Sequence, residues 1–166
     1  MKKENKRSVS ARASRQGFTL IEILIVVAII AILASVVLVG LGPTQQAGRD
    51  ARRLSDLRQT QTGLELYYSK CGYYPGTAAC GASTAQTTWA TMSASLTGTS
   101  IGVNSVPNDP KSGATYYYTS FSGGSTYTIG AVMENANGSE FTGYNPPANL
   151  PTGMANCASP NYCVAL

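Results

Sequence analysis

The chain has 166 residues and a mass of 17.4 kDa, which is the size of one small domain with an additional segment. Charged residues make up only 12% of it and histidine is absent, which excludes Ser-His-Asp and Cys-His catalytic groups and any metal site with an imidazole ligand. Carboxylates are also few. We therefore expect no enzyme activity, no catalytic residue, no cofactor and no metal site.

The net charge of +4 is unevenly distributed along the chain. Residues 1–17 hold six basic residues and one acidic residue, whereas residues 18–166 hold six basic and seven acidic ones. A basic head on a nearly neutral body is typical of a targeting segment and not of a nucleic-acid surface. We therefore expect no nucleic-acid partner.

From Phe18 to Leu41 the chain is apolar over 24 residues, with Thr19, Glu22 and Ser35 as the polar exceptions. A helix of roughly 20 apolar residues crosses a bilayer. Because the basic residues of this region all precede the run, we expect the amino terminus to stay in the cytoplasm. An ordinary signal peptide has a shorter apolar region, roughly 7–15 residues. A plain membrane anchor leaves Glu22 unexplained, because a carboxylate in hydrocarbon costs on the order of 2.5–3.5 kcal/mol.

The residues Arg15-Gln16-Gly17-Phe18-Thr19-Leu20-Ile21-Glu22 resemble the prepilin signature of type IV pilins and type II secretion pseudopilins. The resemblance implies that a prepilin peptidase removes residues 1–17 by cutting between Gly17 and Phe18, and that the same enzyme methylates the new amino group of Phe18. It also implies that residues 18–43 form a hydrophobic transmembrane and assembly helix. Glu22 would then pair with the amino group of Phe18, on its own chain or, as the family favours, on a neighbouring subunit.

This resemblance implies a structural subunit that polymerises into an extracellular type IV pilus-like filament. The alternative is a pseudopilin of a type II secretion or DNA-uptake machine, and the segments 64–68, 73–75, 106–110 and 116–118 look like the major pseudopilin type. The implied partners are membrane lipid before assembly, further copies in a homo-oligomeric filament, the peptidase and the pilus or pseudopilus assembly machinery. The precursor would be a single-pass protein of the cytoplasmic membrane, and its product would lie at the cell surface.

Beyond the apolar run, Gly40, Gly42 and Pro43 interrupt the helical pattern and predict a linker or a segment that kinks. Residues 44–70 return to helical spacing and predict an amphipathic helix. Its apolar stripe would consist of Ala47, Ala51, Leu54, Leu57, Leu64 and Tyr68. We expect the charges at 49–58 to form a solvated face with the pairs Asp50–Arg53 and Arg52–Asp56, the alternatives being contacts between subunits and, last, anion or DNA binding.

Residues 71–166 are rich in Ser, Thr, Gly and Tyr and predict a small extracytoplasmic domain. The pattern favours a short helix over 85–97, strands at 115–120 and 126–133 joined by a hairpin loop, and a last strand at 162–165. The tyrosines of these strands are interpreted as packing residues. The predicted fold class is α+β: a long N-terminal helix packed on a small antiparallel sheet, as in the pilin fold.

Four cysteines follow the apolar run, at Cys71, Cys80, Cys157 and Cys163. They lie on the exported side, where disulfides persist, and none forms a C-x-x-C motif. We expect a structural role, with the local pairs Cys71–Cys80 and Cys157–Cys163 favoured over a bridge from the tail to the helix end.

Overall fold

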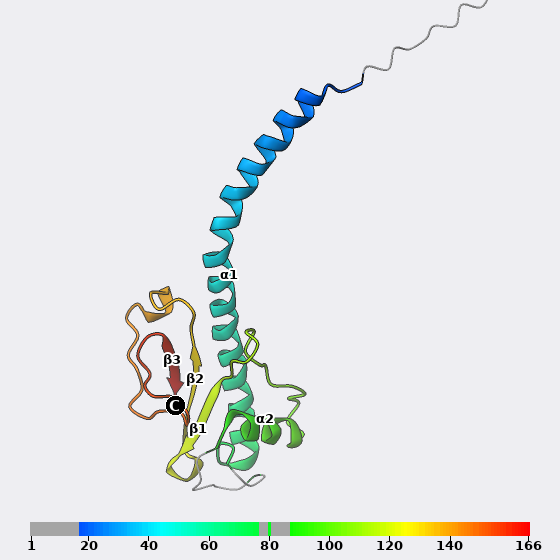
Figure 1. Ribbon diagram of the computed structural model, residues 1–166. Coiled ribbons are helices and arrows are strands. Elements are labelled where there is room, and N and C mark those ends of the chain that lie inside the picture. The colour runs from blue at the N-terminus through cyan, green and yellow to red at the C-terminus, as the bar shows by residue number, and fades with distance from the viewer. Residues whose placement is uncertain (1–16, 77–79, 81–86) are drawn as a thin grey trace, which may run out of the picture. The chain divides into compact units, whose positions relative to one another are not determined.

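The computed structural model describes residues 17–76, 80 and 87–166, without the side chains of 38–40, so the predicted leader lies outside the described residues except for Gly17. The chain divides into two compact units, residues 1–41 and 42–166. The elements in chain order are α1 (Leu20–Cys71), α2 (Trp89–Gly98), β1 (Tyr117–Phe121), the 3-10 turn η1 (Ser122–Gly124), β2 (Thr126–Val132), the 3-10 turn η2 (Ser139–Phe141) and β3 (Asn161–Ala165) (Figure 1). A long N-terminal helix with a small antiparallel sheet confirms the predicted α+β fold class.

Helix α1 contains 52 residues and passes through the position where the sequence predicts an interruption. Pro43 lies inside it and removes one backbone hydrogen bond, without ending the helix. The helix ends at Cys71, where Gly72 adopts a left-handed φ of +77° and its N–H donates to the carbonyl of Tyr68 at 2.7 Å. Glycine takes this conformation without steric strain, so the terminating signal in the sequence corresponds to a real helix cap.

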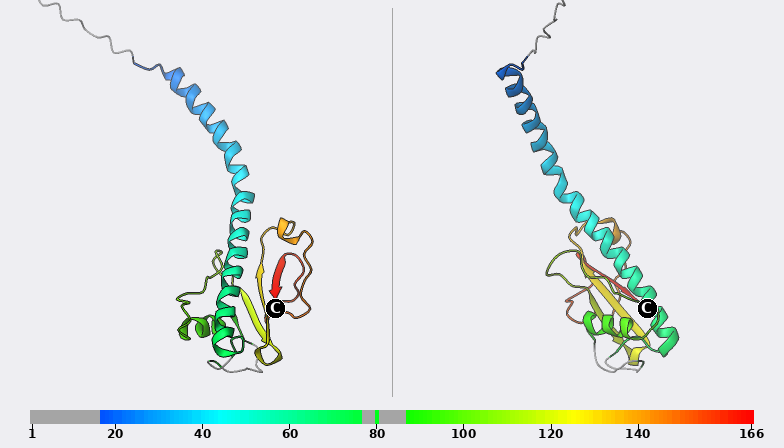
Figure 2. Two further views of the ribbon diagram at one scale, coloured as in Figure 1. Left: turned by 180° about the vertical axis from the view of Figure 1, so that it is seen from behind. Right: turned by 90° about the vertical axis from the view of Figure 1, so that its right-hand side faces the viewer.

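The sheet is antiparallel with the order β1-β2-β3, and it packs against residues 42–71 of α1 (Figures 1 and 2). One face of the sheet, α1 and α2 share a core of fully or nearly fully buried side chains. Its members include Leu57, Leu64 and Tyr67 of α1, Trp89, Met92 and Leu96 of α2, and Tyr118, Tyr127, Ile129 and Ala131 of the sheet. The hairpin and the last strand are thereby confirmed. The short helix predicted over 85–97 is confirmed from Trp89 onward, while residues 85 and 86 lie outside the described residues.

The second face of the sheet is covered by the segment that precedes β3. Met154, Cys157 and Cys163 form a small buried cluster there, and Tyr117 packs against it. Gly130 of β2 faces this cluster, and a Cβ atom at that position would come within 3.0 Å of the Met154 sulfur. Both faces of the sheet are therefore covered, which explains why its strands show long runs of buried residues instead of strict alternation.

The predicted apolar stripe of residues 44–70 is wrong at its ends. Leu57 and Leu64 are buried as expected, but Ala47 and Ala51 are exposed and Tyr68 is 39% exposed. The buried face of α1 instead begins with the charged residues Asp50 and Arg53. Exposing Ala47 and Ala51 costs little because the side chain of alanine is a single methyl group. The buried position of Arg53 is stabilised by its carboxylate partners.

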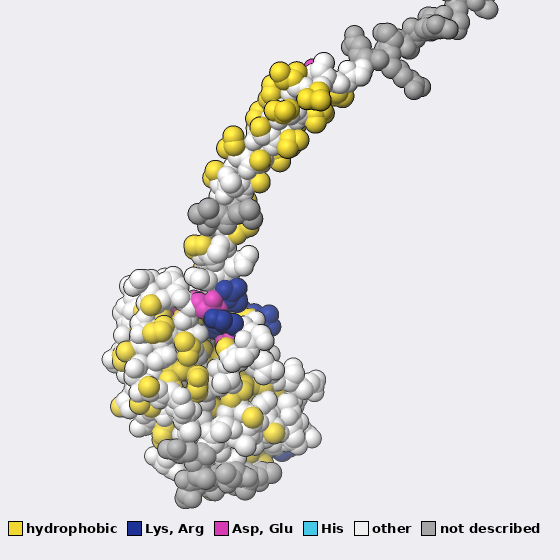
Figure 3. Space-filling model, viewed as in Figure 1, with side chains coloured by type: hydrophobic (Ala, Val, Ile, Leu, Met, Phe, Trp, Pro, Cys, Tyr) yellow, Lys and Arg dark blue, Asp and Glu magenta, His cyan; other side chains and the backbone are white. Residues whose placement is uncertain are grey.

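Arg53 is the centre of a buried ionic cluster and its side chain is 1% exposed. Its guanidinium donates to Asp109 through two nitrogens at 2.7 and 2.8 Å, to Asp50 at 2.7 Å and to Glu134 at 3.1 Å. Arg49 donates to both oxygens of Glu134, at 2.6 and 2.7 Å. The expected solvated face is therefore wrong for Asp50 and Arg53, because these residues join α1 to the turn at 109 and to the end of β2. Figure 3 shows these opposite charges gathered in one place.

Buried tyrosines make the other polar contacts of α1. The hydroxyl of Tyr116 donates to Asp56 at 2.7 Å, and that of Tyr74 donates to Glu65 at 3.0 Å. Burial raises the pKa of the Tyr116 hydroxyl above its ordinary value, and the Asp56 carboxylate adds to this effect. Tyr116, Tyr118 and Tyr127 are buried packing residues, as the strand pattern predicts, and the hydroxyls of Tyr116 and Tyr74 are satisfied by carboxylates of α1.

We predict that Arg53→Met destabilises the folded unit by about 3–5 kcal/mol, because it leaves buried carboxylates without their counter-ion. The exposed Arg58→Met is the matched control and should change the free energy of unfolding by less than about 0.5 kcal/mol. The free energy of unfolding of each variant is measured by denaturant titration of the full chain in detergent. The signal is the near-ultraviolet circular dichroism of tyrosine and tryptophan. Equal stabilities of the two variants would contradict a structural role for the cluster.

Acid should weaken the same cluster. Hydrogen bonds from Arg49 are the main cause that lowers the pKa of Glu134 from its ordinary 4.5 to about 2, and Arg53 adds to them. Burial opposes ionisation of Asp109, but hydrogen bonds from Arg53 and from the Lys111 backbone outweigh it and lower the pKa of Asp109 too. Because the folded-state pKa lies below the unfolded one, this stabilisation is complete above about pH 4.5 and is lost as the pH falls toward 2.

The measurement is the free energy of unfolding between pH 7 and pH 2 for the unmodified chain and for Glu134→Gln, which does not titrate. We expect Glu134→Gln to be less stable at neutral pH and to lose less stability in acid. Parallel curves for the two proteins would show that Glu134 does not contribute to the pH dependence.

Candidate functional site

The first turn of α1 contains a reciprocal hydrogen-bonded pair between Thr19 and Glu22. The backbone N–H and the hydroxyl of Thr19 both donate to one Glu22 carboxylate oxygen, at 2.8 and 2.7 Å, and the N–H of Glu22 lies 3.4 Å from the Thr19 hydroxyl. This is a capping box, in which the N-cap and the third helical residue satisfy each other's backbone donors. The spacing Thr-x-x-Glu is visible in the sequence, and it is the signal by which this contact could have been found.

The Gly17–Phe18 peptide bond lies ahead of this turn. Residues 17–19 have no regular secondary structure and are exposed, and Phe18 is 84% exposed. A cut at this bond would leave the Thr19–Glu22 pair intact, because neither partner belongs to the removed segment. The structure therefore brings the predicted residues Phe18 and Glu22 to the same end of α1.

The part of α1 that follows exposes almost only hydrocarbon. The large aliphatic side chains from Leu20 to Val37 are between 51% and 82% exposed, and Figure 3 shows them along this stretch of helix. The most apolar window of α1 has a mean hydropathy of 3.3 and is long enough to cross a membrane. Glu22 and Ser35 are the polar side chains in this stretch. The Ser35 hydroxyl donates a hydrogen bond to the carbonyl of Ile32 at 2.7 Å.

Residues 12–38 match the family model described as the prokaryotic N-terminal methylation motif. The chain carries the N-terminal signature of type IV pilins and pseudopilins. The motif implies processing by a prepilin peptidase and assembly into a filament, and together with the apolar helix it fits a membrane-anchored precursor of a structural subunit. No curated protein and no solved structure matches the chain.

The predicted cysteines form two separate disulfides in the second unit. Cys71 bonds to Cys80 beyond the end of α1, and Cys157 bonds to Cys163 of β3. The backbone N–H of Cys80 also donates to the buried Tyr67 hydroxyl at 2.9 Å, which ties the first loop to the core. Each disulfide closes a short loop and so reduces the conformational freedom of the unfolded chain.

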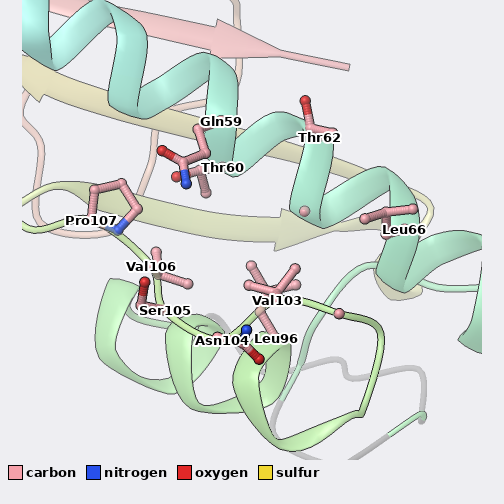
Figure 4. A pocket seen from close by; sticks show the side chains of 12 residues that line it. Gln59, Thr60, Thr62, Leu66, Leu96, Val103, Asn104, Ser105, Val106 and Pro107 are labelled. Atoms are coloured by element: carbon pink, nitrogen blue, oxygen red, sulfur yellow. The ribbon is translucent and has the colours of Figure 1, made fainter.

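The second unit also has an open groove of about 410 Å³ between α1 and the segment 102–107 (Figure 4). Its walls are aliphatic or neutral polar side chains, among them Gln59, Leu66, Val103 and Val106. No residue that lines this groove has an ionisable side chain. The lining of this groove therefore offers aliphatic contacts and hydroxyl and amide groups for hydrogen bonds.

Proposed function

We propose that this chain is a structural subunit that polymerises into an extracellular type IV pilus-like filament after a prepilin peptidase cuts between Gly17 and Phe18 and methylates Phe18. The observation that supports the proposal best is the exposed apolar surface from Leu20 to Val37, directly behind the methylation motif. Because the cut lies ahead of that surface, the mature chain that begins at Phe18 retains the whole apolar surface. Such a helix has to be covered either by lipid or by equivalent helices of other copies.

Glu22 supplies the register of assembly in this proposal. Its carboxylate already accepts two hydrogen bonds from Thr19, and cleavage would place the new cationic amine of Phe18 next to this turn. In a core of packed helices, a charge that lacks a partner is strongly destabilising, whereas a paired carboxylate and amine offset each other. Neighbouring copies would therefore align so that each amine of Phe18 meets a Glu22 carboxylate.

A pseudopilin of a secretion or DNA-uptake machine is the second candidate. It would use the same stem and differ in the length and location of the assembly. The segments 64–68, 73–75 and 116–118, which resemble major pseudopilins, supply Leu64, Tyr67, Tyr74, Tyr116 and Tyr118 to the buried core. Electron microscopy of filaments sheared from cells, with mass spectrometry of their subunits, distinguishes the candidates, because a pilin dominates surface fibres and a pseudopilin is scarce in them.

Replacing Gly17 by valine should block maturation. The exposed peptide bond ahead of α1 would then carry a branched side chain where the signature has glycine, and the precursor would accumulate at full length. Mass spectrometry of the membrane fraction measures this, since the mature product begins at a methylated Phe18. Ser14→Val, in the segment that cleavage would remove, is the matched control and should mature normally. Normal maturation of Gly17→Val would refute the assigned cleavage site.

Glu22→Ala should still enter the membrane but assemble poorly, with a filament yield reduced at least about tenfold, because the amine of Phe18 loses its counter-charge. Glu22→Gln is the informative control, since glutamine keeps the capping box but carries no charge. If charge pairing matters, both variants fail to assemble. Filaments from Glu22→Gln at the unmodified yield would reduce the role of Glu22 to helix capping.

A further inference from the structure

Nine of the twelve charged side chains that the structure describes in residues 42–166 have a partner within that unit. The partnered groups are Arg49, Asp50, Arg53, Asp109 and Glu134 in the buried cluster, Arg52 with Asp56, Glu65 with Tyr74, and Lys70 with the carbonyl of Thr99. Among the charged side chains that the structure describes in this unit, those of Arg58, Lys111 and Glu140 form no hydrogen bond or ion pair. One anionic side chain, that of Glu140, and two cationic ones, those of Arg58 and Lys111, therefore have no partner within the unit.

Glu140 is the most constrained of the three. It belongs to η2 and lines a groove of about 170 Å³ whose other wall is α1, with Ala47, Ala51 and Leu54. Its Oε1 atom is shielded from solvent and has no hydrogen-bond partner in the structure. A carboxylate oxygen in such a place is unfavourable unless a donor reaches it. Glu140 as a whole is only half-buried, so a donor from outside the chain would reach its carboxylate from the exposed side, over the exposed Ala47 and Ala51.

Lys111 lies at the other side of the unit. It is exposed, and it belongs to the turn that leads into β1, whereas η2 lies in the connection from β2 to β3. Since β1 and β3 are the two edge strands, the two residues belong to opposite edges of the sheet. Figures 1 and 2 agree in placing this turn and η2 on opposite flanks of α1.

A polymer of identical copies requires two different and complementary surfaces on each copy. One flank of this unit carries an unpaired carboxylate in a groove, and the other carries an unpaired amine on a flexible stem. We propose that Lys111 of one copy enters the groove at Ala47 and Ala51 of the next copy and pairs with Glu140. This inference rests on the proposed assembly of the chain, and its occupant is a second copy of the same chain.

Arg58 is less suited to the same contact. It follows Ala51 by seven residues on α1, which is two helical turns along the same face, so it lies on the flank that carries the groove. A head-to-tail contact needs its cation on the opposite flank. Arg58 therefore provides a matched control with the same charge, similar exposure and a different position.

The first experiment is zero-length cross-linking with a carbodiimide, which joins an amine directly to a carboxylate that touches it. Full-length protein with light isotopes and full-length protein with heavy isotopes are produced in the same membranes and treated together. We expect a cross-linked peptide that joins Lys111 to Glu140 with one light and one heavy member. A Lys111–Glu140 peptide that is always light–light or heavy–heavy would place the pair within one chain and overturn the proposal.

The second experiment is a charge exchange read out as the yield of sheared filaments. Lys111→Glu and Glu140→Lys each place like charges together, and we expect each to reduce the yield about tenfold or more. The double variant restores opposite charges and should recover most of the yield. Arg58→Glu changes the net charge as Lys111→Glu does and should leave the yield unchanged. Equal loss in Arg58→Glu, or no recovery in the double variant, would overturn the pairing.

The two experiments separate this inference from the proposed function. Filaments without the mixed cross-link overturn the ion pair and leave the filament function standing. A mixed cross-link in membranes of cells that make no filament, and no pseudopilus, supports the ion pair and contradicts the function. Absence of both the cross-link and any assembly overturns both.

Discussion

The apolar surface of α1 between Leu20 and Val37 is the constraint on which the rest of the molecule depends. Its aliphatic side chains are at least half exposed, and each square ångström of such surface favours leaving water by about 25 cal/mol. Only lipid or another apolar helix can cover a surface of this shape. The single carboxylate in this stretch is that of Glu22, and Thr19 donates two hydrogen bonds to one of its oxygens. The other oxygen and the charge of the carboxylate are still open to a cationic partner.

The second unit is stabilised differently, because its interior contains many polar groups and several of them bond to side chains of α1. Arg53 binds Asp109 and Glu134 near the start of the packed helix, and the hydroxyls of Tyr116 and Tyr74 bind carboxylates further along it. A core with few large aliphatic residues gains less from burial alone. Directional hydrogen bonds from α1 to the turn at 109, the sheet and the loop at 74 define one packing arrangement for the helix.

Local patterns in the sequence predict the elements well and the buried face of α1 only in part. The spacing of Trp89, Met92 and Leu96 identifies α2, and alternation identifies the strands, because these signals lie within a few residues of one another. The burial of Arg53 could not be read in this way, since its partners Asp109 and Glu134 lie 56 and 81 residues away along the chain. A lone arginine on a helix is exposed by default, and only the folded topology supplies the carboxylates that reverse this preference.

The position of the charges along the chain explains why cleavage and assembly would be coupled. Residues 1–17 hold six basic groups and one acidic group, so uncut helices packed in parallel would bring several like charges together at one end. In the proposed function, the cut removes this repulsion and leaves one cationic amine on Phe18, four residues before Glu22, the acidic residue of the first turn of α1. Cutting the bond between Gly17 and Phe18 therefore replaces the repulsion between the basic residues 1–17 by an attraction between the new amine and a Glu22 carboxylate. That carboxylate belongs either to a neighbouring copy or to the same chain. Because Thr19 already holds Glu22 at this end of α1 in the uncut chain, the acceptor for the new charge would be in place when the charge appears.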